Sequence, residues 1–120
     1  MADFALSRSE LRFAEVLWDN EPVKSGKVVE ICSEKFGWKK STTYTVLKSL
    51  CEKGIFTNEK SIIISLVTRH EFLHNKARLF VDVYFGGSFS GFVASYRDGR
   101  AFSRDDIIEL YNAAKKYSNE

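Results

Sequence analysis

The segment 41–53 constrains the fold more than any other part of this 120-residue chain. Its apolar and polar residues recur at the spacing of an α-helix. One face of the predicted helix carries Thr43, Val46, Leu47, Leu50 and Cys51. The opposite face carries Tyr44, Thr45, Lys48 and Glu52, and Gly54 follows as a stop signal. A helix of this kind packs by its apolar face and leaves a hydrogen-bonding face for a partner.

Two further helices are predicted before this segment. Ser7 and Glu10 fit a capping box, and the helix that they begin ends at residues 19–22. A second helix is predicted over residues 25–36, with Gly37 as its C-terminal cap. The apolar positions of the first helix are Leu11, Ala14, Leu17 and Trp18.

A β-hairpin is predicted after the third helix. Two β-branched runs, 55–57 and 62–67, flank the turn residues 58–61. Three short helices followed by a hairpin is the order of a winged helix-turn-helix. In that fold the third helix packs against the second and the hairpin forms the wing.

The rest of the chain is predicted to be helical. A long helix (69–85), a short helix (89–96) and a final helix capped by Ser103 and Asp106 follow in order. Breaks between them are marked by Gly86, Gly87, Asp98 and Gly99. We therefore expect a mostly α protein with a small β wing. It has a winged-helix domain (1–68) and a three-helix dimerisation domain (69–120).

The three C-terminal helices hold more large apolar residues than an appendage of about fifty residues can bury alone. Pairing two copies would bury them, and each buried side chain favours association by roughly 1.5–3 kcal/mol. We predict an intertwined homodimer formed by Phe72, Phe80, Tyr84, Phe89, Phe92, Ile108 and Tyr111. The alternative is that this tail packs on its own winged helix.

Positive charge is concentrated in the window 35–53, which holds five lysines and one acid in a chain of net charge +2. A basic stripe attracts a polyanion, although a solvated lysine-rich helix has the same composition. The major groove of B-DNA admits one α-helix. We predict an interface with a double-stranded DNA operator formed by Lys39, Lys40, Ser41, Thr42, Tyr44, Thr45, Lys48 and Lys60.

Each part of this interface has a predicted partner. Ser41 and Thr42 present hydroxyls and free amides to a phosphate at the start of a helix. Lys48 has the length to reach guanine or phosphate, and Lys60 is expected at the wing tip. Because a dimer carries two such helices, the expected operator is an inverted repeat with half-sites one helical turn, or a multiple, apart.

Several classes of protein are excluded by composition and motifs. The chain is 44% hydrophobic and 28% charged, which is typical of a folded globular protein. Its longest aliphatic run is 62–64, far below the ~20 residues of a membrane span. The first residues lack a signal peptide, and Cys32 and Cys51 do not suggest a secreted disulfide scaffold. We expect a cytoplasmic protein without membrane insertion.

Enzyme chemistry is not expected. The chain lacks a phosphate-binding Gly-x-x-x-x-Gly-Lys motif and a His-Glu-x-x-His motif. His70 and His74 share a helix face but have no thiol or carboxylate partner visible in the sequence, so we predict two exposed histidines and no metal. Cys32 and Cys51 fall on predicted core faces. No cofactor is expected.

Four stretches of the chain together resemble the BlaI/MecI/CopY family of repressors. They are LSRSELRFAEVLW (6–18), WKKSTTYTVLKSLCEKGIF (38–56), Ser65-Leu66-Val67 and Tyr84-Phe85-Gly86-Gly87. The resemblance covers nearly the whole chain in order, and the stretch from Trp38 to Gly54 is its most specific part. It implies an N-terminal winged helix, a C-terminal dimerisation domain linked near Thr68, and repression of β-lactamase, methicillin-resistance or copper genes.

The resemblance also implies a mode of regulation. In the antibiotic-sensing branch, a membrane sensor protease system responds to β-lactam and the repressor is cut within its dimerisation domain. By alignment the cut bond is Ser95–Tyr96, where the aromatic residue is retained and the preceding Asn is not. The copper branch carries Cys-x-Cys motifs near its C-terminus. This chain has no cysteine after Cys51, so copper sensing is not expected.

Two departures from the resemblance affect the interface. Ser49 lies where relatives usually carry Arg, which removes a phosphate contact or an internal ion pair. The wing is shorter and less basic than in the best-known relatives. A winged helix used only for protein contact, without specific DNA binding, is the alternative function.

Overall fold

The computed structural model describes residues 2–98 and 101–118. These residues form two compact units, which divide between Ala77 and Arg78. None of the described helices has the length and apolar character needed to cross a membrane.

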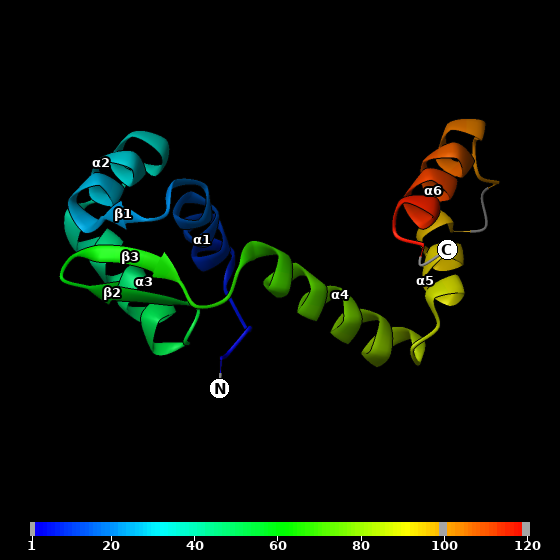
Figure 1. Ribbon diagram of the computed structural model, residues 1–120, viewed down its shortest axis with the longest axis horizontal. Helices are drawn as coiled ribbons and strands as arrows, with labels where there is room; N and C mark the ends of the chain where they lie inside the picture. Colours follow the sequence, from blue (N-terminus) through cyan, green and yellow to red (C-terminus); the bar gives the residue numbers. More distant parts are fainter. Residues whose placement is uncertain (1, 99–100, 119–120) are drawn as a thin grey trace. The chain divides into compact units, whose positions relative to one another are not determined.

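Unit 1 is a winged helix (Figure 1). Its elements are, in order, α1 (Arg8–Asn20), β1 (Val23–Lys24), α2 (Ser25–Phe36), α3 (Lys40–Glu52), β2 (Phe56–Glu59), β3 (Ile62–Ser65) and the first part of α4 (Arg69–Phe85). The helices α1, α2 and α3 contact one another, and β3 contacts α1. The strands form an antiparallel sheet in the order β1-β3-β2. The predicted fold class is confirmed.

Local signals determine where the helices begin and end. Ser7 and Glu10 form the predicted capping box, in which each side chain accepts a hydrogen bond from the other residue's amide. Gly37 ends α2 in the left-handed region with φ 68°, where a side chain would be strained. Each signal depends only on residues that are close together in the chain. The start of α1 and the end of α2 were therefore predicted correctly.

The sheet differs from its prediction at three places. β2 continues to Glu59, which pairs with Ile62, so the turn is only the two residues Lys60 and Ser61. β3 ends at Ser65, because Leu66 and Val67 donate to the Ile55 carbonyl instead. The strand β1 was not predicted at all, since its two residues become a strand only by pairing with β3.

Aromatic side chains join the helices of unit 1 in its core. The Trp18 indole N–H donates to the Val67 carbonyl at 3.0 Å, and its ring lies 5.5 Å from that of Phe56. Phe13 stacks on Trp38 at 5.8 Å, beside the turn between α2 and α3. Leu11 is one of the apolar positions predicted for the first helix but is 37% exposed, because the buried face of α1 is centred on Phe13, Ala14 and Leu17.

The first turn of α4 packs against the rest of unit 1. Thr68 and Glu71 bond each other's amides in a capping arrangement. Arg69 forms ion pairs with Glu15 at 2.7 Å and Asp19 at 2.6 Å. Phe72, 3% exposed, stacks on Phe4 and contacts Trp18. The start of α4 is therefore part of the winged-helix unit. The predicted division into a DNA-binding domain (1–68) and a dimerisation domain (69–120) remains a proposal.

Unit 2 contains the end of α4, α5 (Phe89–Arg97) and α6 (Arg104–Lys116). Gly86 and Gly87 end α4 with φ of 57° and 81°. Ser103 and Asp106 form the predicted capping box of α6. Asp98 ends α5 in the left-handed region, whereas its predicted turn partner Gly99 lies outside the described residues. The predicted order of long, short and final helix is confirmed.

Candidate nucleic-acid interface

Helix α3 separates a buried face from an exposed polar face. Thr43, Leu47 and Leu50 are at most 3% exposed, and Val46 and Cys51 are partly buried against the same core. On the other side Thr45 and Lys48 are exposed. The two faces therefore agree with the two that the sequence predicts.

The exposed side chains of Thr45 and Lys48 make contacts within α3. The Thr45 hydroxyl donates to the Ser41 carbonyl at 2.9 Å, one turn earlier in the helix. Lys48 lies 4.0 Å from Glu52, and both side chains are more than half exposed, at 79% and 67%. Such an ion pair is weak, about 0.3–0.5 kcal/mol. Lys48 can therefore leave Glu52 for a phosphate or a base at little cost.

Tyr44 differs from its neighbours, because its hydroxyl already has a partner. It donates to Ser25 Oγ, in the first turn of α2, at 3.2 Å. The residue is 36% exposed, so part of the ring still faces solvent. The phenol thus links α3 to α2.

The start of α3 has the composition of an anion site. Lys39 is its N-cap and gives no side-chain hydrogen bond to the helix. Lys40, Ser41 and Thr42 are exposed beside it. The first amides of the helix are thus not capped by the N-cap side chain, and a phosphate is a suitable acceptor for them.

The wing adds cations from two segments. Lys60 is exposed at the hairpin turn. Lys24 in β1 is also exposed and lies opposite Ile62, two residues beyond Lys60 on the wing. Lys24 was not among the predicted residues, since its place beside the wing depends on a strand of only two residues.

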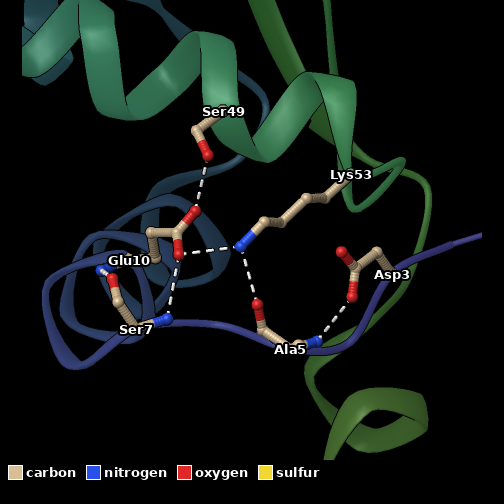
Figure 2. A network of polar contacts seen from close by, with 6 residues as sticks. All are labelled: Asp3, Ala5, Ser7, Glu10, Ser49 and Lys53. Carbon is tan, nitrogen blue, oxygen red and sulfur yellow. Dashed lines mark hydrogen bonds and ion pairs between the residues drawn. The ribbon is translucent and has the colours of Figure 1, made fainter.

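A polar network holds the C-terminal end of α3 against α1 and the N-terminal segment (Figure 2). Glu10, only 9% exposed, receives a hydrogen bond from Ser49 at 2.6 Å and an ion pair from Lys53 at 2.9 Å. Lys53 also donates to the Ala5 carbonyl at 2.6 Å. Asp3 donates its amide to the Lys53 carbonyl at 2.7 Å. These contacts fix the position of α3 in unit 1.

The charge of Glu10 is strongly stabilised in this network. Burial by itself raises the pKa of Glu10, but hydrogen bonds from Ser49, Ser7 and Lys53 outweigh it and lower the pKa to about 2. Glu10 is therefore ionised at neutral pH. Ser49 points inward to this carboxylate, and Lys53 from the same helix supplies the cation.

Large apolar side chains of unit 2 are exposed. None of the described residues after Phe72 is buried. Phe80, Tyr84, Phe89, Ile108 and Tyr111, all predicted for a dimer interface, are between 47% and 71% exposed. Phe92 is half-buried, with its ring 5.6 Å from that of Phe85. Phe72, also predicted for a dimer interface, lies in the core of unit 1 and is 3% exposed.

These side chains border an apolar groove within unit 2. It has a volume of about 750 Å³ and is lined by residues of α5 and α6 together with Phe102. Its lining is Phe89, Ser90, Val93, Ala94, Phe102, Ile107, Leu110, Tyr111, Ala113 and Ala114. The bond between Ser95 and Tyr96 lies in α5, and both residues are exposed.

Candidate metal and thiol groups do not assemble into a site. His70 and His74 are exposed on α4, as predicted. Among the described residues no three His, Cys, Asp or Glu side chains are grouped to hold a metal. Burial raises the pKa of Cys32 to about 11, against a lowering influence of Lys35. Burial also raises the pKa of Cys51. Both thiols are therefore protonated and poorly reactive.

The fold and this surface define a winged-helix protein with an exposed polar helix, a wing and a separate helical unit rich in exposed apolar residues. The model of the penicillinase repressor family matches residues 6–116, so the chain belongs to that family. It is thus a transcriptional repressor of a DNA-binding family. No curated protein matches the chain.

Proposed function

We propose that this repressor is a homodimer that binds an inverted-repeat operator through α3. The observation that carries the proposal is the face of α3 that holds Thr45 and Lys48, which is exposed while the other face is anchored in the core. Lys39, Lys40, Ser41 and Thr42 would bind phosphate at the start of the helix, and Tyr44 would add its ring. Lys60, joined by Lys24, would contact the flanking backbone.

The dimer part of the proposal is supported by unit 2. Its apolar groove and exposed aromatic residues are unusual for a monomer, because large exposed apolar patches mark interaction surfaces. A second copy offers the same apolar surface in return, which is the property that a two-fold interface needs. Two α3 helices would then bind two half-sites of one operator.

Regulation by cleavage at Ser95–Tyr96 is a further part of the proposal. A cut there would divide α5, one wall of the apolar groove. Each winged helix would then lose the second half-site contact and the avidity that comes with it. On this proposal the regulated genes are β-lactam resistance genes and the cut is made by a membrane sensor protease system.

Selection of duplexes from a randomised pool by the full-length chain tests the proposal, followed by mobility shifts at several salt concentrations. We expect selected duplexes to share an inverted repeat and affinity to fall steeply with salt. Recovery of unrelated sequences, or binding to a single half-site as tight as to the repeat, would contradict the proposal.

One observation favours a second candidate function. The outer side of the wing carries Ile62, Ile64 and Leu66, which are 37%, 43% and 58% exposed. An apolar stripe on a wing suits contact with a protein more than with a phosphate backbone. A winged helix used only for protein contact would give weak, sequence-independent DNA binding in the same selection.

A further inference from the structure

The hydroxyl of Tyr44 is the first member of a short hydrogen-bonded relay. Tyr44, in the middle of α3, donates to Ser25 Oγ at 3.2 Å. Ser25 begins α2, and only 6% of its surface is exposed. Because Ser25 has little room to move, this bond couples α3 to one fixed point on α2.

The second bond of the relay reaches the wing. The Ser25 amide donates to the Ser61 carbonyl at 2.9 Å. Ser61 is one of the two turn residues of the hairpin, next to Lys60. Thus the middle of α3, the start of α2 and the tip of the wing are connected through one serine.

The conformation of the wing tip makes it dependent on such a contact. Lys60 and Ser61 have φ of 53° and 67°, in the left-handed region that glycine or asparagine usually occupies in two-residue hairpin turns. Neither residue favours this region, so surrounding contacts must hold the turn. The hydrogen bond from Ser25 is one such contact, and the pairing of β1 with β3 beside it is another.

We propose that Tyr44 is a positioning residue for the wing: through Ser25, its hydroxyl holds the turn at which Lys60 meets a DNA phosphate beside the half-site. This inference rests on the proposed function, because it concerns how the same interface reaches DNA. It gives the Tyr44 hydroxyl a role different from a direct contact with a base.

Two variants that each remove one partner of the first bond test the proposal. Tyr44→Phe deletes the donor and keeps the ring, and Ser25→Ala deletes the acceptor and keeps the amide that bonds Ser61. Tyr117→Phe, which removes the hydroxyl of an exposed tyrosine outside unit 1, is the matched control. The probe is a duplex selected from the randomised pool by the full-length chain.

Both variants are expected to lose the one phosphate contact that Lys60 makes. The slope of log affinity against log salt should then fall by about 0.9, so their deficit relative to the wild type shrinks about 3.5-fold when salt is raised fourfold. Hydroxyl-radical protection beside the half-site should weaken, while base preference within it stays unchanged. Tyr117→Phe should match the wild type.

The Lys60→Ala background distinguishes a positioning role of the Tyr44 hydroxyl from a direct contact of that hydroxyl with DNA. If Tyr44 acts through the wing, Tyr44→Phe has no further effect on affinity in the Lys60→Ala background, and Tyr44→Phe and Ser25→Ala are not additive. A full effect of Tyr44→Phe in that background, or wild-type affinity of Ser25→Ala, overturns the proposal and assigns the hydroxyl to DNA.

A measurement without DNA separates this inference from the proposed function. In the free full-length chain, amide hydrogen exchange of Ser25 should be faster in Tyr44→Phe than in Tyr117→Phe, because the relay is weakened. Unchanged exchange overturns the positioning role whether or not the chain binds an operator. Failure of the wild type to select any repeat contradicts the proposed function alone.

Discussion

Ser49 donates a hydrogen bond of 2.6 Å to Glu10, which joins α3 to the first turn of α1. The same carboxylate accepts from Lys53 at 2.9 Å. A buried carboxylate that accepts hydrogen bonds from several donors stabilises the fold only while it is ionised. The position of α3 therefore depends on the ionisation of one side chain that never meets DNA in the proposed interface.

Acid should weaken unit 1 through Glu10. Its pKa is about 2 in the folded chain against an ordinary value of 4.5, so the stabilisation is complete above pH 4.5 and is lost as the pH falls toward 2. The difference between the two pKa values corresponds to roughly 3–3.5 kcal/mol. We expect Glu10→Gln to lower the free energy of unfolding at neutral pH by about 3 kcal/mol and to flatten its pH dependence. Urea denaturation at a series of pH values measures both.

The control for this experiment is Glu59→Gln, which removes an exposed carboxylate from the wing. It should leave the pH dependence of the free energy of unfolding as in the wild type. Equal pH dependence in Glu10→Gln and the wild type would show that the network contributes nothing to acid stability.

Lys48→Ala should weaken operator binding without destabilising the fold, because its ion pair with Glu52 is exposed. A lost phosphate contact would reduce the salt slope by about 1, and a lost base contact would relax preference at one position at a cost of about 1–3 kcal/mol. Mobility shifts with single-position variants of the selected duplex measure both. Lys116→Ala, in the last turn of α6, is the charge-matched control. Identical behaviour of the two variants would remove Lys48 from the interface.

Leu110→Asp should convert the proposed dimer to a monomer. Leu110 lines the apolar groove and is 40% exposed. Loss of one buried leucine from each copy corresponds to a dissociation constant raised roughly a thousandfold. Sedimentation equilibrium measures this, with circular dichroism to verify helix content. Leu66→Asp, which places the same charge on the wing, should leave the dimer intact; a dimeric Leu110→Asp would argue against a second copy in this groove.

Cutting the bond between Ser95 and Tyr96 should abolish tight operator binding. A recognition site for a specific protease, inserted at that bond, allows the cut to be made in the purified protein. Loss of avidity predicts a fall in affinity of about 10²–10⁴-fold, while binding to a single half-site stays the same. The uncut variant, treated with inactivated protease, is the control. Undiminished affinity after complete cleavage would contradict regulation by this route.

The sequence predicted those features that depend on neighbouring residues. The capping boxes at Ser7 and Ser103 and the left-handed cap at Gly37 each involve contacts within a few residues. The two faces of α3 were also predicted, because helical periodicity records burial directly. These local patterns were sufficient for the order of the helices and the hairpin and for the fold class, but not for β1.

Contacts between distant residues were not predictable in the same way. Tyr44 and Ser25 are 19 residues apart, and Ser49 and Glu10 are 39 apart. Phe72 follows the apolar pattern of α4 without a break, yet its ring packs on Trp18 in unit 1. Periodicity gives the face of a helix on which a residue lies, whereas its partner depends on how the chain is folded back.

The packing of Trp18 against Phe56 and Phe72 has a practical consequence. The chain has two tryptophans, Trp18 and Trp38, and both belong to unit 1. Four of its five tyrosines belong to unit 2. Indole emission therefore follows the melting of the winged helix alone, and phenol absorbance follows mainly the other half. The native chain thus carries two built-in optical reporters, and each half can be monitored without an attached dye.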